Sequence, residues 1–221
     1  MSFTYQSVVD LAEVFLKDES NDRWDAADLF SYAIEGENEA VREKPDINAV
    51  VETVGTLTAG CIQSLPSLGI QLLDVTTNMG TDGTTRGNIV TMVERKYMDR
   101  INPGWMTDTA SATITHVIYD FERLPKKYWV YPQSPGTNYL EVITSKLFDN
   151  GSKVIGDNAL IADEYKIAIK HYILASAYAM DEEDPYSNEK AVAHYNRFLS
   201  ILQTRNSLER QLNPKRTNEG V

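Results

Sequence analysis

The stretch Val50-Val51-Glu52-Thr53-Val54-Gly55-Thr56-Leu57-Thr58 decides the fold class of this chain. Its β-branched residues and its alternation are typical of a strand, whereas the residues before it follow helical spacing. Similar composition, interrupted by closely spaced turn formers, continues to about residue 156. We therefore predict a single α+β domain over residues 1–221, in which an antiparallel β-rich insertion at residues 47–156 interrupts a mainly helical core.

Three strands are expected in the second half of this insertion, at residues 114–120, 128–132 and 139–145. Short proline-bearing turns separate them, and short connections are typical of neighbouring antiparallel strands, so we predict a meander. The earlier loop at residues 78–87 is rich in glycine and contains Arg86. It lacks the GxxxxGK[ST] pattern of a phosphate-binding loop, which favours a turn or hairpin tip with Arg86 at a surface or interface.

Helical patterns occupy both ends of the chain. Apolar residues recur at helical spacing after Ser7, a candidate N-cap, and again from residue 22 until Pro45, with Gly36 weakening the middle. These patterns predict N-terminal helices within residues 1–46. A third pattern, capped by Asp157 or Asn158, and a fourth from Ser187 predict a helical hairpin over residues 157–203. The polar residues 204–221 are expected to form a flexible tail.

The charge balance disfavours nucleic acid as a partner. The chain has 21 Lys and Arg against 32 Asp and Glu, a net charge of −11, which repels a phosphate backbone unless the cations gather in one patch. Acids outnumber bases 12 to 4 in residues 1–50, whereas residues 201–221 hold four bases and two acids. The net charges of the two ends of the chain therefore differ in sign.

No targeting or disulfide signal is visible. Cys61 is the single cysteine, so an intrachain disulfide cannot form. No apolar stretch reaches the roughly 18 residues typical of a membrane span, and the N-terminus lacks a signal-peptide pattern. Synthesis in the cytoplasm, without a membrane partner, is the expectation.

Neither a catalytic nor a metal-binding pattern is present. His116, His171 and His194 lack the spacing of metal ligands, although the last two could approach each other across the predicted hairpin. The acidic cluster at residues 181–184 lacks the spaced ligands of a calcium loop and is interpreted as a solvated turn. We therefore predict no enzyme activity, no metal and no cofactor. A cell-wall hydrolase stays an alternative, because paired carboxylates form in three dimensions.

The aromatic run Tyr128-Trp129-Val130-Tyr131 follows two lysines, a combination that could stack nucleic-acid bases. Strand alternation sends Tyr128 and Val130 to one face, and Trp129 and Tyr131 to the other. One face would then be core, and the other would be exposed or covered by a partner. Because the chain is acidic, interface or core packing is favoured over base stacking, and the same applies to Trp105.

The order of several landmarks resembles the head-to-tail adaptor (head-completion) proteins of short-tailed and some other tailed bacteriophages. The resemblance covers roughly residues 7–202, and its landmarks are turns and packing residues. They are Trp24-Asp25-Ala26-Ala27-Asp28-Leu29, Ala59-Gly60-Cys61-Ile62-Gln63-Ser64-Leu65-Pro66, Leu72-Leu73-Asp74-Val75-Thr76-Thr77-Asn78-Met79-Gly80, Asn102-Pro103-Gly104-Trp105, Tyr119-Asp120-Phe121 through Tyr131-Pro132, and Tyr172-Ile173-Leu174-Ala175-Ser176-Ala177-Tyr178-Ala179.

This resemblance implies a structural virion protein, assembled in the host cytoplasm. Such proteins form a ring, usually of twelve copies, between the portal and the tail tube or nozzle, and DNA passes through the ring without specific binding. The C-terminal tail commonly docks onto the portal, which makes Arg205, Arg210, Lys215 and Arg216 the candidate portal-binding residues. The β segment would face neighbouring subunits and the tail, with Arg86, Trp105, Trp129 and Tyr131 as candidate interface residues. A DNA-binding assembly factor is the remaining alternative.

Overall fold

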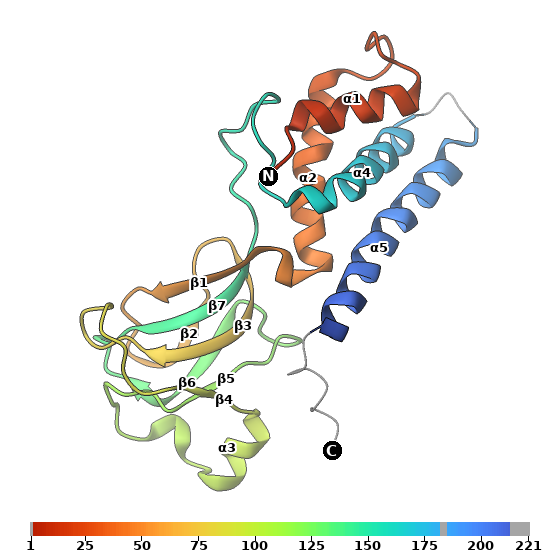
Figure 1. Cartoon of the computed structure of the whole chain (residues 1–221). Helices are drawn as coiled ribbons and strands as arrows, with labels where there is room; N and C mark the ends of the chain where they lie inside the picture. The colour runs from red at the N-terminus through yellow and green to blue at the C-terminus, as the bar shows by residue number, and fades with distance from the viewer. Residues whose placement is uncertain (1, 182–184, 213–221) are drawn as a thin grey trace. The chain divides into compact units, whose positions relative to one another are not determined.

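The chain is α+β and divides into two compact units (Figure 1). The computed structural model describes residues 2–181 and 185–212, and the side chains of residues 205–212 lie outside the description. The helical unit comprises Met1–Ile47 and Phe148–Val221, and the β unit comprises Asn48–Leu147. The β unit is therefore shorter at its C-terminal end than the predicted insertion at residues 47–156.

The N-terminal part of the helical unit contains α1 (Tyr5–Leu16) and α2 (Ala26–Glu43). Thr4, not Ser7, is the N-cap of α1, since its hydroxyl oxygen accepts the Ser7 backbone N–H. Asp25 caps α2 by accepting the Ala27 N–H. A short 3₁₀ helix, η1 (Pro45–Asn48), follows α2.

The C-terminal part contains η3 (Asp163–Tyr165), α4 (Lys166–Ala179) and α5 (Ser187–Leu212). The prediction that a helix starts at Asp157 or Asn158 is wrong. Backbone groups there pair with the N-terminal segment instead: Tyr5 N–H donates to Asp157 O at 3.0 Å, and Ala159 N–H donates to Phe3 O at 2.8 Å. These bonds hold the segment in an extended conformation, and α4 begins only after η3.

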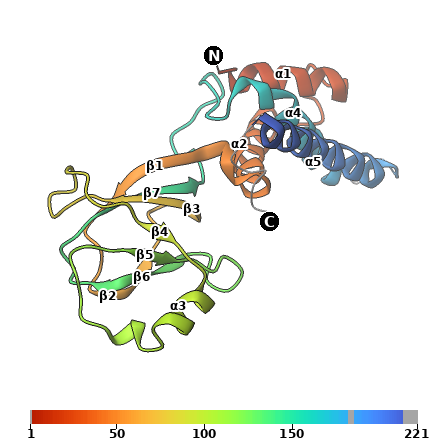
Figure 2. The same cartoon turned by 60° about the horizontal axis from the view of Figure 1, so that its bottom comes forward.

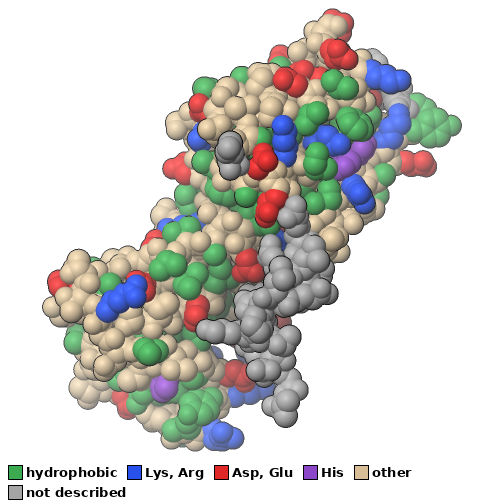
Figure 3. All heavy atoms as spheres, in the orientation of Figure 1, with side chains coloured by type: hydrophobic (Ala, Val, Ile, Leu, Met, Phe, Trp, Pro, Cys, Tyr) green, Lys and Arg blue, Asp and Glu red, His purple; other side chains and the backbone are tan. Residues whose placement is uncertain are grey.

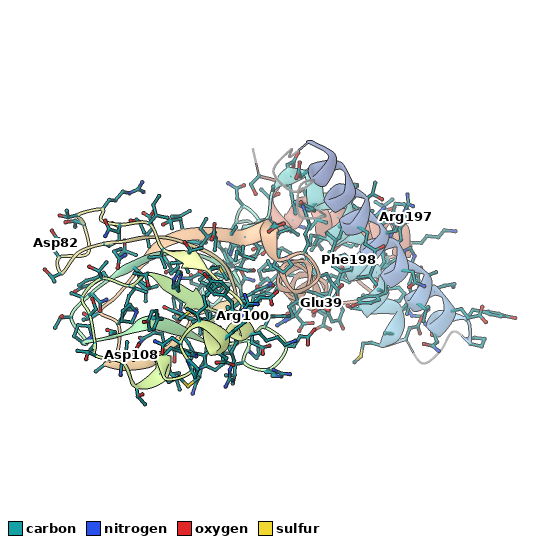
Figure 4. The ribbon with its side chains drawn as sticks, turned by 90° about the horizontal axis from the view of Figure 1, so that it is seen from below. Glu39, Asp82, Arg100, Asp108, Arg197 and Phe198 are labelled. Carbon is teal, nitrogen blue, oxygen red and sulfur yellow. The ribbon has the colours of Figure 1, made fainter. Side chains whose placement is uncertain are left out.

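α4 packs against α1, α2 and α5 (Figure 1). Phe198 of α5 is fully buried, whereas its neighbour Arg197 is exposed on the outer side of the helix (Figure 4). The core of the unit is continuous across all four helices. Its largest fully buried side chains are Tyr5, Leu29, Ile161, Ile169, Ile173, Leu174 and Phe198.

Gly36 has a packing role that its sequence context did not reveal. A β-carbon built on it would lie 2.9 Å from Cδ1 and 3.2 Å from Cβ of Tyr172. The missing side chain therefore lets α2 approach α4 closely. The low helix propensity of glycine, about 1 kcal/mol worse than alanine, is offset by this contact between the helices.

Glu37 is a buried carboxylate at the centre of the helical unit. It accepts the Tyr5 hydroxyl at 2.8 Å and the backbone N–H groups of Leu160 and Ile161 at 2.8 and 3.0 Å. One side chain thus joins α1, α2 and the extended segment before η3. Burial raises the pKa of Glu37, and the three hydrogen bonds oppose that shift.

The β unit contains two sheets (Figure 2). The first has the order β1 (Ala49–Val54), β7 (Leu140–Lys146) and β3 (Gly69–Asn78). The second has the order β2 (Gly60–Ser64), β6 (Lys127–Ser134), β5 (His116–Ile118) and β4 (Thr91–Met92). Neighbouring strands are antiparallel except β4 and β5, which are parallel, so the wholly antiparallel prediction is wrong at that edge.

The predicted meander is correct for one of its two strand pairings and wrong for the other. β5 and β6 pair as antiparallel neighbours, but β7 lies in the other sheet, between β1 and β3. The reason is the shared core: Tyr128 and Val130 of β6 pack in one cluster with Leu140 and Val142 of β7. Two apolar strand faces that cover each other must belong to opposite sheets, whereas strands that share an edge cannot do so.

Candidate interaction surfaces

The second face of β6 is covered by the chain itself. Helix α3 (Arg95–Ile101) and the 3₁₀ helix η2 (Trp105–Thr107) lie on it, and Trp105 and Trp129 are only 1% and 7% exposed. They pack with Met98 and Ile118. The prediction that Trp105 and Trp129 contact a partner directly is therefore corrected, because these side chains form a core with Met98 of α3.

Tyr131 is half-buried at the edge of this aromatic core. Its hydroxyl donates to Asp108 Oδ2 at 3.0 Å, and its ring stacks on His116 with centroids 6.2 Å apart. Asn102 Nδ2 donates to the same Asp108 oxygen at 2.5 Å. Asp108, which is labelled in Figure 4, thus joins the segment after α3 to the sheet. A partner at this place would contact only the exposed part of the Tyr131 side chain.

Arg86 lies in the loop after β3. Its side chain is 71% exposed and pairs with Glu141, with Nη2 to Oε2 at 2.9 Å. Asp82, labelled in Figure 4, accepts the backbone N–H groups of Thr84 and Thr85, both at 3.0 Å, and these bonds lower the pKa of its carboxyl group. The carboxylate therefore already occupies amides that a phosphate would need. The geometry agrees with a turn and not with a phosphate cradle.

The outer side of α3 borders a cavity of about 510 Å³, lined by Val93, Glu94, Lys96, Tyr97 and Arg100. Tyr97 is 42% exposed, and Ile101, one turn further on, is 56% exposed. Among the described residues lining the cavity, Glu94 is the one acid. A hydrolase in the β segment would need two carboxylates in a cleft, so this cavity does not favour that alternative.

The helical unit has a hollow of about 740 Å³ where the α1–α2 connection meets the end of α4. Arg23 pairs with Asp181 in its wall, and Trp24 makes an edge contact with Tyr178 at 6.3 Å. Burial raises the pKa of Tyr32, and the negative charges of Asp28 and Glu35 add to the shift. The lining residues are Asp22, Arg23, Trp24, Asp28, Tyr32, Met180 and Asp181, so the hollow combines acids with aromatic rings.

Comparison with known families decides what kind of protein presents these surfaces. A family model described as SU10 adaptor protein matches residues 3–218, nearly the whole chain. The chain belongs to the SU10 adaptor protein family. Comparison with curated proteins gives no match. The resemblance to phage head-to-tail adaptors is thereby confirmed at the level of the family.

Family membership makes this chain a structural adaptor of a phage virion. A place at the head–tail junction, in contact with portal and tail components, follows from it. Adaptors of this kind are structural proteins. Within the described part of the chain, no helix combines the length and apolar character needed to cross a membrane.

The candidate portal-binding residues fall at the end of this SU10 adaptor. α5 continues to Leu212, past residue 203 where the hairpin was predicted to end, so Arg205 and Arg210 lie on its last turns. Their side chains are outside the described residues, and Lys215 and Arg216 lie outside them entirely. The tail assignment therefore stays a prediction.

His171 and His194 meet between α4 and α5. Their Nδ1 atoms are 2.9 Å apart and their rings are stacked. Only one of the two nitrogens can donate, so in at least one of the rings Nδ1 carries no proton and that ring is neutral. Burial and the neighbouring Lys170 ammonium lower the pKa of both, that of His171 to about 4.

This pair predicts acid sensitivity of the helical unit. The folded pKa values lie below the unfolded value of 6.5, so the unfolded chain binds more protons, and the free energy of unfolding should fall as the pH drops from about 6.5 towards about 4. Urea unfolding of the protein and of the variant His171→Leu/His194→Leu across this range measures the difference. Equal pH dependence in both proteins would contradict the assignment.

Proposed function

We propose that this adaptor forms a closed ring, of twelve copies, that joins the portal to the tail and continues the DNA channel. The match to the SU10 adaptor protein family over residues 3–218 carries the proposal. A net charge of −11 per subunit supports it, since an acidic lumen lets DNA slide without sticking. In the ring, the β unit faces neighbouring subunits and the tail, with Arg86 and the exposed part of Tyr131 as contacts.

We assign the portal contact to the basic end of the chain. Among the described side chains, Leu202, which is 2% exposed, is the last member of the helical core, and the assignment concerns the residues beyond it. Their four cations can form charge-assisted hydrogen bonds with an acidic or carbonyl-rich portal surface. The cations are Arg205, Arg210, Lys215 and Arg216.

Neutralising these cations tests the assignment. The variant with all four changed to glutamine is expected to fold normally and to bind isolated portal rings at least about tenfold more weakly, because several charge-assisted contacts are lost. Deletion of residues 204–221 should weaken binding further. The matched control Arg123→Gln/Lys127→Gln removes two exposed cations of the β unit. If the fourfold variant binds portal as tightly as this control, the tail assignment is wrong.

Ring formation has its own measurement. Negative-stain imaging of the protein, alone and with portal rings, should show closed rings at least in the presence of portal. Counting subunits in those images checks the number twelve. Open filaments or monomers under both conditions would contradict the proposed ring.

A further inference from the structure

Helix α3 has two faces with different surroundings. Its inner face is anchored: Met98 is 2% exposed, Asp99 accepts the Trp105 Nε1–H at 2.9 Å, and Arg95 lies over the Trp129 ring at 5.7 Å. Its outer face carries Lys96 and Arg100, one turn apart, beside the exposed Tyr97 and Ile101. Tyrosine, arginine and aliphatic side chains on a rigid support are typical of the centre of a protein interface.

The two cations of this outer face restrict the kind of partner that can cover it. Several of its cations have carboxylate partners, such as Arg86 with Glu141, Arg123 with Asp120 and Lys146 with Glu52. Lys96 and Arg100 make no ion pair with any residue in the described part of the chain. Covering Tyr97 and Ile101 with a partner would remove water from these charges, which is costly unless the partner supplies acids. The occupant of this face must therefore be acidic.

The hollow of the helical unit has the matching chemistry. Asp22 and Asp28 are exposed and, within residues 2–181 and 185–204, neither forms an ion pair. Trp24 and Tyr32 present rings beside them, and Met180 is 72% exposed. Acids next to aromatic faces are suited to a guanidinium or an ammonium group flanked by apolar side chains.

The wall of the hollow is held in place before any partner arrives. Asp18 accepts the backbone N–H groups of Asp22, Arg23 and Trp24 at 2.9, 3.0 and 2.8 Å, and these bonds lower the pKa of its carboxyl group. Arg23 already lies over the Trp24 ring at 4.9 Å. A preformed wall reduces the entropy lost on binding.

We propose that, in the ring, the outer face of α3 of one copy docks into the aspartate–aromatic hollow of a neighbouring copy. The inference rests on the proposed ring. A cyclic assembly needs two different, complementary surfaces on each subunit. This chain carries both the cationic outer face of α3 and the acidic hollow of the helical unit. Figure 3 shows acidic side chains over the α1–α2 connection, and basic and hydrophobic ones at the α3 end of the β unit.

A second copy fits the α3 face better than DNA does. Glu94 lines the same cavity as Lys96 and Arg100, so a phosphate backbone would meet a carboxylate beside the two cations. The net charge of −11 adds long-range repulsion. An acidic protein surface with aromatic rings can bind the cations, Tyr97 and Ile101 together.

Charge reversal tests the docking. Lys96→Glu/Arg100→Glu and Asp22→Lys/Asp28→Lys, each made alone, should lower the fraction of protein in rings at least about tenfold, because like charges then face each other. Mixing the two variants should restore rings in which the variants alternate. In such a ring, every acidic α3 face meets a basic hollow, and every unchanged α3 face meets an unchanged hollow. The chain that carries all four changes should also assemble. Native mass spectrometry and negative-stain imaging, with and without portal rings, count the assemblies.

Controls separate the possible outcomes. Circular dichroism checks that each variant folds. If the lysine variant does not fold, Asp22→Asn/Asp28→Asn replaces it, and the loss of rings by that variant alone, without the mixing experiment, is then the readout. Arg123→Glu/Lys127→Glu reverses two exposed cations away from α3 and should assemble normally. If the unaltered protein never forms rings, the proposed function itself fails. If it does, and the α3 or hollow variants assemble equally well or are not rescued by mixing, the docking is overturned while the ring stands. A salt-sensitive DNA shift that Lys96→Glu/Arg100→Glu abolishes without affecting rings would instead assign the α3 face to nucleic acid.

Discussion

Replacing Glu37 with leucine is expected to lower the free energy of unfolding of the helical unit by about 3–5 kcal/mol. The substitution leaves the Tyr5 hydroxyl and the N–H groups of Leu160 and Ile161 without their acceptor. Each buried donor left unpaired costs about 1–3 kcal/mol, and relaxation of the site recovers part of the sum. Urea unfolding followed by circular dichroism measures the loss.

Glu37→Gln is the matched control. Its amide oxygen can accept both backbone N–H groups, and its amide nitrogen can donate to the Tyr5 hydroxyl oxygen, so we expect a loss of about 1 kcal/mol or less. Because burial raises the pKa of Glu37 above 4.5, the unaltered protein should lose some stability as the pH rises through the folded pKa, and the glutamine variant should not. Equal midpoints for the leucine and glutamine variants would show that the carboxylate does not hold these donors.

Replacing Trp105 with alanine should destabilise the β unit by about 3–5 kcal/mol, as expected for a large aromatic removed from a core. The ring is 1% exposed, packs with Trp129 and Met98, and donates from Nε1 to Asp99. Hydrogen exchange of β6 amides, compared with amides of α4, locates the loss in the β unit. Tyr97→Ala, at a 42% exposed position of α3, should change stability by about 0.5 kcal/mol or less.

The same pair of variants separates core packing from partner contact. If Trp105→Ala left the β unit as stable as before but weakened ring assembly, Trp105 would be the contact residue that its sequence context suggested. We expect the reverse for Tyr97→Ala, with unchanged stability and weaker assembly. Native mass spectrometry of both variants gives the comparison.

Much of the architecture could be predicted because it depends on local patterns. The change from helical spacing to alternation, predicted at residue 47, lies next to the start of the β unit at Asn48. The order of turn and packing landmarks was sufficient to suggest the adaptor family, which the family model confirms. The approach of His171 to His194 was also visible in sequence, as two histidines on consecutive helices.

The tertiary structure alone decided which apolar faces cover one another. Alternation placed Trp129 and Val130 on opposite faces of the strand. Whether α3 or a partner covers the Trp129 face depends on a segment about thirty residues earlier in the chain. For the same reason β7 could not be assigned to a sheet, and Gly36 could not be recognised as a contact with Tyr172. Local spacing determines which side of an element is apolar, whereas the partner of that side is set by contacts between distant residues.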